Sequence, residues 1–328
     1  MSQGSATVRG TSASSPAGRT PSLWRRMRGP QGRNLWYAAF AAPFIIGLLV
    51  FVYIPIGWST YLSFFEARAT IRPTKFVGLD NYTYLLSDPI FRSSLVTFMI
   101  FALFIVPVTY VCSLGLALLL NGVRWGQAFF RSVFFIPTAV SYVVAAMVWR
   151  LSFFNGARFG LANSMLRQFG GENKAWLLGG DNYWYWFVVI SLRLWLQVGF
   201  YMILIIAGLN RIPFETYEAA AIDGATGWKR LLYVTLPQLR TTTVAVLMLL
   251  LIGAFQAFDE FLNLFGGIGT YPNFARPPLV HLYLISLGGS QQDLGLGGAG
   301  TIIVTGLIVL FGLAQTWLVN RSERKERR

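Results

Sequence analysis

Six long apolar stretches dominate the pattern of hydrophobic and polar positions along the chain. Polar segments separate them, and each has room for the roughly 20 residues that a helix needs to cross a bilayer. The pattern therefore predicts an all-α integral membrane protein with six transmembrane helices. Pro107 and Pro137 suggest bends in the spans that contain them, but membrane helices also tolerate single prolines without a functional bend. The predicted spans cover residues 37–65, 94–120, 132–153, 185–209, 242–261 and 301–320.

The basic residues between these stretches indicate an orientation. The chain carries 27 Lys and Arg against 13 Asp and Glu, for a net charge of +14. Seventeen of the basic residues fall in the two tails and the second and fourth loops, against eight in the other loops. Because cytosolic loops are enriched in Lys and Arg, both termini and the fourth loop are expected in the cytosol. Membrane topology explains this charge better than nucleic-acid binding.

The tails and outer loops have their own signals. Residues 1–33 hold six arginines and no acid among Ser and Gly, which predicts a disordered basic cytosolic tail; the Gly and Pro content argues against a transit peptide. A six-span domain is predicted over 34–320, and a second basic cytosolic tail over 321–328. The fifth loop, 262–300, should contain a short helix over 279–287 at the outer surface. An aromatic belt at the membrane interface is predicted in the third loop from Trp176, Tyr183, Trp184 and Trp186.

The fourth loop, residues 212–239, carries the densest local signals. Pro213 can begin a helix because the first turn leaves its missing N–H unpaired in any case. Ala219 to Ala221 continue that helix with a nearly flat surface, and Asp223 and Gly224 end it, since glycine adopts the left-handed cap conformation without a Cβ penalty.

A second helix follows within the same loop. Thr226 can cap it, and Trp228, Leu231 and Leu232 then share one apolar face at i, i+3 and i+4. Leu236 and Pro237 end the unit. The two helices should form a compact projection suited to a groove on another protein.

At these residues the chain resembles a known family. Glu218-Ala219-Ala220, Gly224 three residues later and, after nine more, Val234-x-Leu236-Pro237 are similar to the EAA loop of bacterial ABC importer permeases; only Val234 departs, where isoleucine is usual. Three further sequence segments resemble the carbohydrate-uptake branch of these permeases, which is of the maltose and glycerol-3-phosphate type. The resemblance therefore spans about 37–320. The three segments are FVGLDNY (76–82), FFRSVFFIP (129–137) and the pair FD (258–259) followed by GG (266–267).

The resemblance implies a type I permease fold in the bacterial inner membrane and a binding-protein-dependent importer of a sugar or oligosaccharide. The implied partners are a second homologous permease subunit, two ATPase subunits and an external solute-binding protein. ATP and Mg would bind the ATPase, and this chain would hold no cofactor. The alternative is a helix-turn-helix without a partner. The residues expected to couple to the ATPase are Glu218, Ala219, Ala220, Gly224, Trp228, Leu236 and Pro237.

Catalytic and metal chemistry finds no support in the sequence. None of the four lysines follows a glycine, so a phosphate-binding G-x-x-x-x-G-K-[ST] loop is missing. With one histidine, His281, and one cysteine, Cys112, neither a Ser/His/Asp triad nor a zinc site can be assembled. Cys112 is expected to pack in an apolar helix. The chain is therefore predicted to be a transport subunit and not an enzyme.

Polar residues within the spans are the remaining candidates for a substrate pathway. Gln256, Asp259, Glu260 and Asn263 recur at helical spacing in the fifth span, and Arg193 in the fourth is their natural counter-ion. Trp195 and Tyr201 could stack on a sugar ring. A structural ion pair explains the charges equally well. The rival functions are an ion-coupled secondary transporter that uses Asp259 or Glu260 and a non-transporting membrane scaffold.

Overall fold

The computed structural model describes residues 30–123, 125–177, 183–266, 271–288 and 292–326, with side chains from 36 to 317. Most of the predicted 1–33 tail lies outside these residues, but Pro30 already begins a helix. The α-helices are α2 (Pro30–Leu48), α3 (Ile54–Leu62), α4 (Asp80–Ser87), α5 (Pro89–Asn121), α6 (Gln127–Phe135), α7 (Tyr142–Val148), α8 (Leu161–Gln168), α9 (Trp184–Leu209), α10 (Phe214–Ile222), α11 (Gly227–Arg230), α12 (Leu236–Gln238), α13 (Arg240–Phe255), α14 (Asp259–Phe265), α15 (Pro278–Ser286) and α16 (Leu294–Glu326).

Short elements complete the chain. Three π-helical turns are η1 (Leu49–Tyr53), η3 (Trp149–Phe153) and η4 (Leu231–Thr235), and two 3-10 turns are η2 (Ile136–Ala139) and η5 (Asn273–Ala275). Strands β1 (Phe65–Glu66) and β2 (Lys75–Phe76) form an antiparallel pair in the first loop.

The first 58 residues form a unit of their own. Its described part is helical through α2 and η1 into the start of α3, and the Ile54 N–H donates to the Leu49 carbonyl across the π turn. The stretch Trp36–Leu62 is long and apolar enough to cross a membrane.

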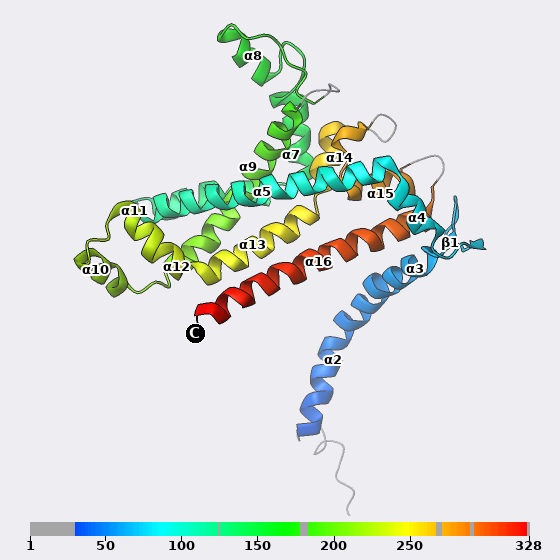
Figure 1. The fold of residues 1–328 in the computed structure, drawn as a ribbon, viewed down its shortest axis with the longest axis horizontal. Helices are drawn as coiled ribbons and strands as arrows, with labels where there is room; N and C mark the ends of the chain where they lie inside the picture. The colour runs from blue at the N-terminus through cyan, green and yellow to red at the C-terminus, as the bar shows by residue number, and fades with distance from the viewer. Residues whose placement is uncertain (1–29, 124, 178–182, 267–270, 289–291, 327–328) are drawn as a thin grey trace, which may run out of the picture. The chain divides into compact units, whose positions relative to one another are not determined.

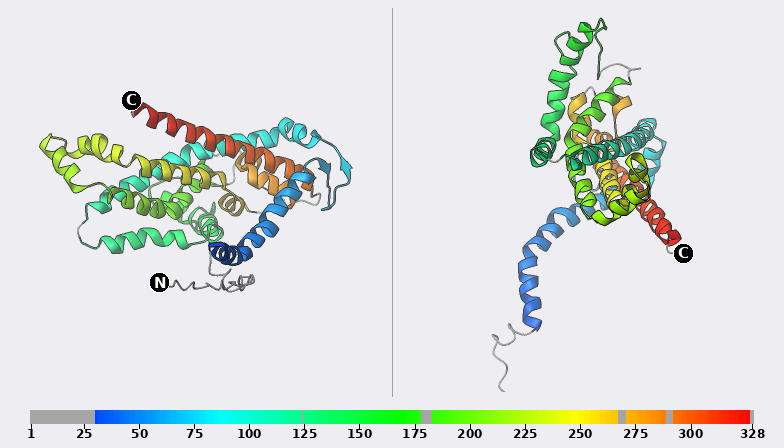
Figure 2. Two further views of the ribbon diagram at one scale, coloured as in Figure 1. Left: turned by 90° about the horizontal axis from the view of Figure 1, so that it is seen from below. Right: turned by 90° about the vertical axis from the view of Figure 1, so that its left-hand side faces the viewer.

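The second unit, from Ser59 onward, is a bundle built on α5, α9, α13 and α16. α5 contacts α9 and α13, and α13 contacts α16, so that the four helices lie alongside one another (Figure 1; Figure 2). Small residues allow close approach in a membrane, where apolar helices gain little from burial alone. Gly199 of α9 illustrates this, because a Cβ there would overlap the Phe134 carbonyl of α6.

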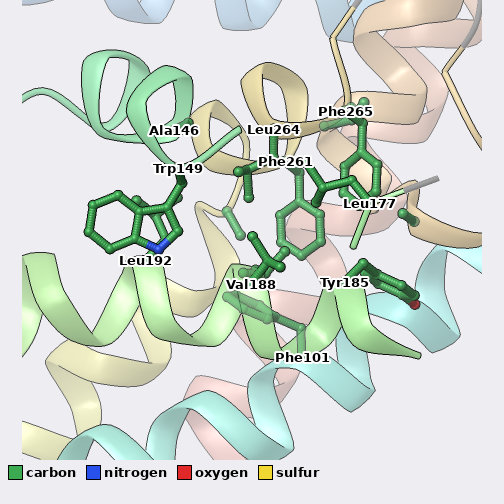
Figure 3. Packing of buried hydrophobic residues seen from close by; sticks show 14 of the residues in the cluster. Phe101, Ala146, Trp149, Leu177, Tyr185, Val188, Leu192, Phe261, Leu264 and Phe265 are labelled. Atoms are coloured by element: carbon green, nitrogen blue, oxygen red, sulfur yellow. The ribbon is translucent and has the colours of Figure 1, made fainter. Parts of the chain in front are cut away.

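The largest apolar core joins α5, α7, α9 and α14. Phe261 and Leu264 of α14 are directed toward Val188 of α9, and Phe101 of α5 closes the cluster from the other side (Figure 3). The Phe101 and Phe261 rings meet edge to face with centroids 5.1 Å apart. This packing fixes α14 against the bundle.

The prediction of six spans is confirmed, but two of them are broken. Four described helices are long and apolar enough to span a membrane, and two bent pairs bring the number to six if each pair is one span. The third span turns by 93° between η2, which contains Pro137, and α7. The fifth is preceded by a 73° bend at Leu239, and α13 ends at Phe255, so the predicted continuous helix over 242–261 is wrong.

Three expectations for the outer loops need correction. Trp176 does not belong to an interfacial belt, since it is buried and its indole N–H donates to Asn163 Oδ1 at 2.9 Å. The short helix of the fifth loop exists as α15, but it packs on α16 and α5, with His281 buried, instead of lying on a surface. Cys112 is exposed on α5 and is not a packed core residue.

Candidate functional site

The coupling segment, residues 212–239, folds into two short helices between α9 and α13 (Figure 1). Pro213 precedes α10 as its N-cap residue, and Asp223 caps its other end. Gly224 then adopts φ +74°, which a β-branched residue resists, and the Ala225 N–H returns to the Ala220 carbonyl at 2.8 Å. The predicted glycine turn is confirmed.

The second helix of the coupling segment is less regular than predicted. Thr226 occupies the N-cap position, but its side chain makes no capping hydrogen bond; its carbonyl accepts from the Lys229 N–H instead. α11 passes through η4 and α12 before the chain bends into α13. Leu239, which is only 1% exposed, lies at that bend and packs in an apolar core between α5, α9 and α13.

Large apolar side chains project from the coupling segment. Ile222, Trp228 and Tyr233 are 87%, 77% and 75% exposed, and all three precede the 73° bend that leads into α13. An exposed apolar cluster of this kind marks an interaction surface. The predicted flat alanine surface is only partly present, because Ala219 and Ala221 are exposed while Ala220 is buried. Glu218 is exposed beside them, and Leu236 and Pro237 lie in α12 as the predicted end of the unit.

A buried ion pair joins α9 to α14. Arg193 Nη1 contacts Glu260 Oε1, with 4% and 3% of the two side chains exposed, and Arg193 Nη2 donates to the Gly253 carbonyl near the end of α13. One guanidinium thus holds both sides of the break between α13 and α14. The predicted pairing of Arg193 is confirmed, with Glu260 and not Asp259 as its partner.

The predicted polar face of the fifth span is not continuous. α13 ends with Gln256 as its cap, α14 starts at Asp259, and Phe258 between them has extended φ of −141°. Gln256 and Asp259 are therefore exposed while Glu260 is buried, and Asn263 donates to the Asp259 carbonyl at 2.7 Å. The regular spacing could not reveal this break, because spacing assumes an unbroken helix.

The aromatic candidates also separate. Tyr201 is buried in the core between α5, α9 and α13, whereas Trp195 is 42% exposed and its ring lies 5.1 Å from that of Trp149. The sequence reasoning missed Tyr142 and Gln197, which lie near Arg193. The Tyr142 ring centroid is 5.5 Å from the guanidinium carbon, and the Gln197 amide donates to the Tyr142 hydroxyl at 2.8 Å. Gln197 lies four residues after Arg193 on α9, a helical spacing that could have identified it, whereas Tyr142 comes from α7 and no local pattern joins it to Arg193.

A second buried polar cluster lies outside the spans. His281 of α15 is almost fully buried, and its Nε2 is 3.5 Å from Asp88 Oδ2, the N-cap of α5. The pKa of His281 is lowered to about 4, mainly by burial and also by the Arg276 charge, although Asp88 opposes the shift. The histidine is therefore neutral at neutral pH.

Among the described residues, no group of three or more His, Cys, Asp or Glu side chains is arranged to hold a metal ion. The described residues offer instead a coupling segment with exposed apolar side chains and a helix break held by the Arg193–Glu260 pair.

Comparison with known proteins places the chain. The family model of binding-protein-dependent transport system inner membrane components matches residues 109–328. The chain belongs to this family. A probable ABC transporter permease protein of Pyrococcus horikoshii is 33% identical over 70% of this permease and 79% of the relative. The arabinooligosaccharide transport system permease of Bacillus subtilis is also 33% identical, over 86% and 89% of the two chains.

Solved structures agree on the fold of this permease. A bacterial ABC transporter described as importing the acidic polysaccharide alginate superposes with a TM-score of 0.77 over 91% of this chain and 98% of that chain, at 22% identity. The permease is thus a multi-pass membrane subunit of an ABC importer and not an enzyme; the ATPase of such a system is a separate partner.

Proposed function

We propose that this permease carries a sugar or oligosaccharide across the inner membrane, driven by an ATPase that docks on the coupling segment. The observation that carries the proposal is the exposure of Ile222, Trp228 and Tyr233 on the coupling segment, between α9 and α13. Relatives named for the transport of α-glucosides and arabinooligosaccharides support a saccharide substrate.

The proposed assembly contains a second, homologous permease, two ATPase subunits that bind ATP and Mg, and an external solute-binding protein. The excess of basic residues in the tails and even-numbered loops favours cytosolic termini, which puts the coupling segment on the ATPase side. The α14–α15 region then lies at the outer side, where the binding protein delivers its ligand.

Within the bundle, the candidate pathway residues divide by exposure. Gln256, Asp259 and Trp195 are exposed, and the half-buried Asn263 donates to the Asp259 carbonyl, so we assign contact with sugar hydroxyls and ring faces to these four. Arg193 and Glu260 are almost fully buried and hold the helix break. Tyr201, also buried, supports the helix that carries Arg193.

The test is a reconstituted transporter in nanodiscs with all partner subunits. Saccharide-loaded binding protein should stimulate ATP hydrolysis, and Trp228→Glu should abolish ATPase co-purification while the permease pair stays assembled. Trp125→Glu is the matched control, because Trp125 is 89% exposed but lies outside the coupling segment. Uptake that continues without any ATPase and is lost in Asp259→Asn would instead establish the ion-coupled alternative.

A further inference from the structure

Arg150 lies in η3, the π-helical turn that ends the third span. Its side chain is half-buried, and within the described residues its guanidinium has no hydrogen-bond or ion-pair partner. A charge at the end of a span is costly unless it is paired or faces water, so such groups usually line an aqueous cavity. Single π turns also occur frequently at functional sites.

Arg150 lines a cavity of about 480 Å³. Its polar groups are Arg150, the Asn263 amide and the Tyr283 hydroxyl, and its remaining side chains are the apolar Met147, Leu151 and Leu262. The Asn263 Nδ2 is used by the Asp259 carbonyl, which leaves Oδ1 free to accept a hydrogen bond. Size and lining match a small-molecule site, which is mostly apolar with a few converging polar groups.

Gly266 makes room for the guanidinium. This residue adopts φ +58°, and a Cβ built on it would overlap the Nη1 and Cζ atoms of Arg150. The first glycine of the GG pair therefore has a steric role, since any side chain at this position would displace Arg150. Its partner Gly267 lies outside the described residues. Gly266 is thus a positioning residue for Arg150.

The charge of the cavity selects its ligand. Among the described residues, none that line the cavity is Asp or Glu, whereas the Arg193 guanidinium is already neutralised by Glu260. Guanidinium groups bind carboxylates through two parallel hydrogen bonds. We propose that Arg150 binds the carboxylate of an acidic saccharide, a uronic acid, while Asn263 and Tyr283 bind its ring hydroxyls. This inference rests on the proposed function and names its substrate class.

The experiment measures ligand binding directly, because uptake also depends on the binding protein. The assembled transporter, in zwitterionic-lipid nanodiscs without binding protein, is titrated with trigalacturonate and with maltotriose by saturation-transfer NMR. We expect Arg150→Gln to weaken trigalacturonate binding at least about tenfold, the loss of a charge-assisted hydrogen bond. Arg150→Lys should recover part of the loss, and Gly266→Ala should reproduce it with the charge intact. Arg158→Gln, a change at an exposed outer-loop arginine, is the charge-matched control and should have no effect.

Equal trigalacturonate affinity in wild type and Arg150→Gln, or an equal loss for maltotriose, would overturn the inference. The titration is repeated in anionic-lipid nanodiscs to distinguish a saccharide carboxylate from a lipid headgroup as the ligand of Arg150. If the anionic lipid binds and no saccharide does, the inference is also overturned. If neutral saccharides stimulate ATP hydrolysis but trigalacturonate never binds, the substrate class fails while the proposed function stands. If no saccharide changes ATP hydrolysis, the proposed function itself fails.

Discussion

Replacing Arg193 tests whether the buried ion pair holds the break between α13 and α14. Arg193→Met keeps most of the side-chain volume but removes the charge, and so leaves Glu260 buried without a counter-ion and the Gly253 carbonyl without its donor. Glu260→Gln removes the opposite charge. The double variant carries neither, and its two neutral side chains can still pack.

The magnitude follows from burial. Both side chains are more than nine-tenths buried, so solvent screens their interaction little. Removing one partner of such a pair costs about 3–5 kcal/mol, whereas neutralising both is often nearly free. Each single change should therefore lower the free energy of unfolding by about 3–5 kcal/mol, and the double variant should lose no more than one single variant, which is a coupling energy of at least about 3 kcal/mol.

The assay is SDS-induced unfolding of the purified permease in mixed micelles, followed by tryptophan fluorescence, together with uptake by the assembled transporter. Asp259→Asn is the matched control because Asp259 precedes Glu260 but is exposed. This variant should change the free energy of unfolding by less than about 0.5 kcal/mol and show no coupling to Arg193. If the pair is structural, uptake returns with stability in the double variant.

Additive losses for Arg193 and Glu260 would refute the reasoning, as would a coupling to Asp259 of the same size. Restored stability without restored uptake would show that one of the two side chains also touches the substrate.

Three further predictions use other parts of the chain. The Gly224→Val permease should insert normally but lose ATPase co-purification and uptake, because valine resists φ +74°. Gly122→Val is the control, because Gly122 has φ −82°. Normal ATPase co-purification and uptake in Gly224→Val would contradict coupling by this turn. Reporters fused after Arg328 and within the coupling segment should be active only as cytosolic reporters, and an active periplasmic phosphatase fusion at the C-terminus would exclude this topology. The free energy of unfolding should fall as pH drops from 6.5 toward 4, because His281 is protonated in the unfolded chain but stays neutral in the folded chain, where its pKa is lowered. In unfolding curves measured between pH 6.5 and 4, His281→Gln should reduce this dependence of the free energy of unfolding on pH.

Most of the fold could be predicted from patterns within short stretches of the sequence. Apolar length alone located the spans, since each span is a continuous segment whose composition reflects the bilayer. Gly224 was identifiable for a similar reason: a helix stop needs only the residues on either side of it. The pairing of Arg193 was also predictable in kind, because an isolated buried guanidinium demands an acid, although spacing did not distinguish Glu260 from Asp259.

Features that depend on contacts between distant segments escaped prediction. Asn163 is fully buried and bonds the Trp176 indole and the Lys174 backbone, so it organises the third outer loop, yet nothing in its sequence context distinguishes it from a surface residue of α8. Trp176 was accordingly misplaced in a membrane belt. The contact between Gly266 and Arg150 is equally non-local, and the glycine pair gave no indication of which side chain needed the space.

The bend at Leu239 and the interruption at 256–258 lie at opposite ends of α13. α13 runs for 16 residues between the bend at Leu239 and the interruption at 256–258, and over that length, about 24 Å, its backbone hydrogen bonds keep it straight. We therefore expect a displacement of the coupling segment to be transmitted along α13 to its far end. There the helix ladder is interrupted, and Arg193 holds the Gly253 carbonyl and Glu260 from the neighbouring α9. The ion pair consequently sits where movement of the coupling segment would be converted into movement of α14 against α9, which explains why a pair that adds little net stability is placed at a break.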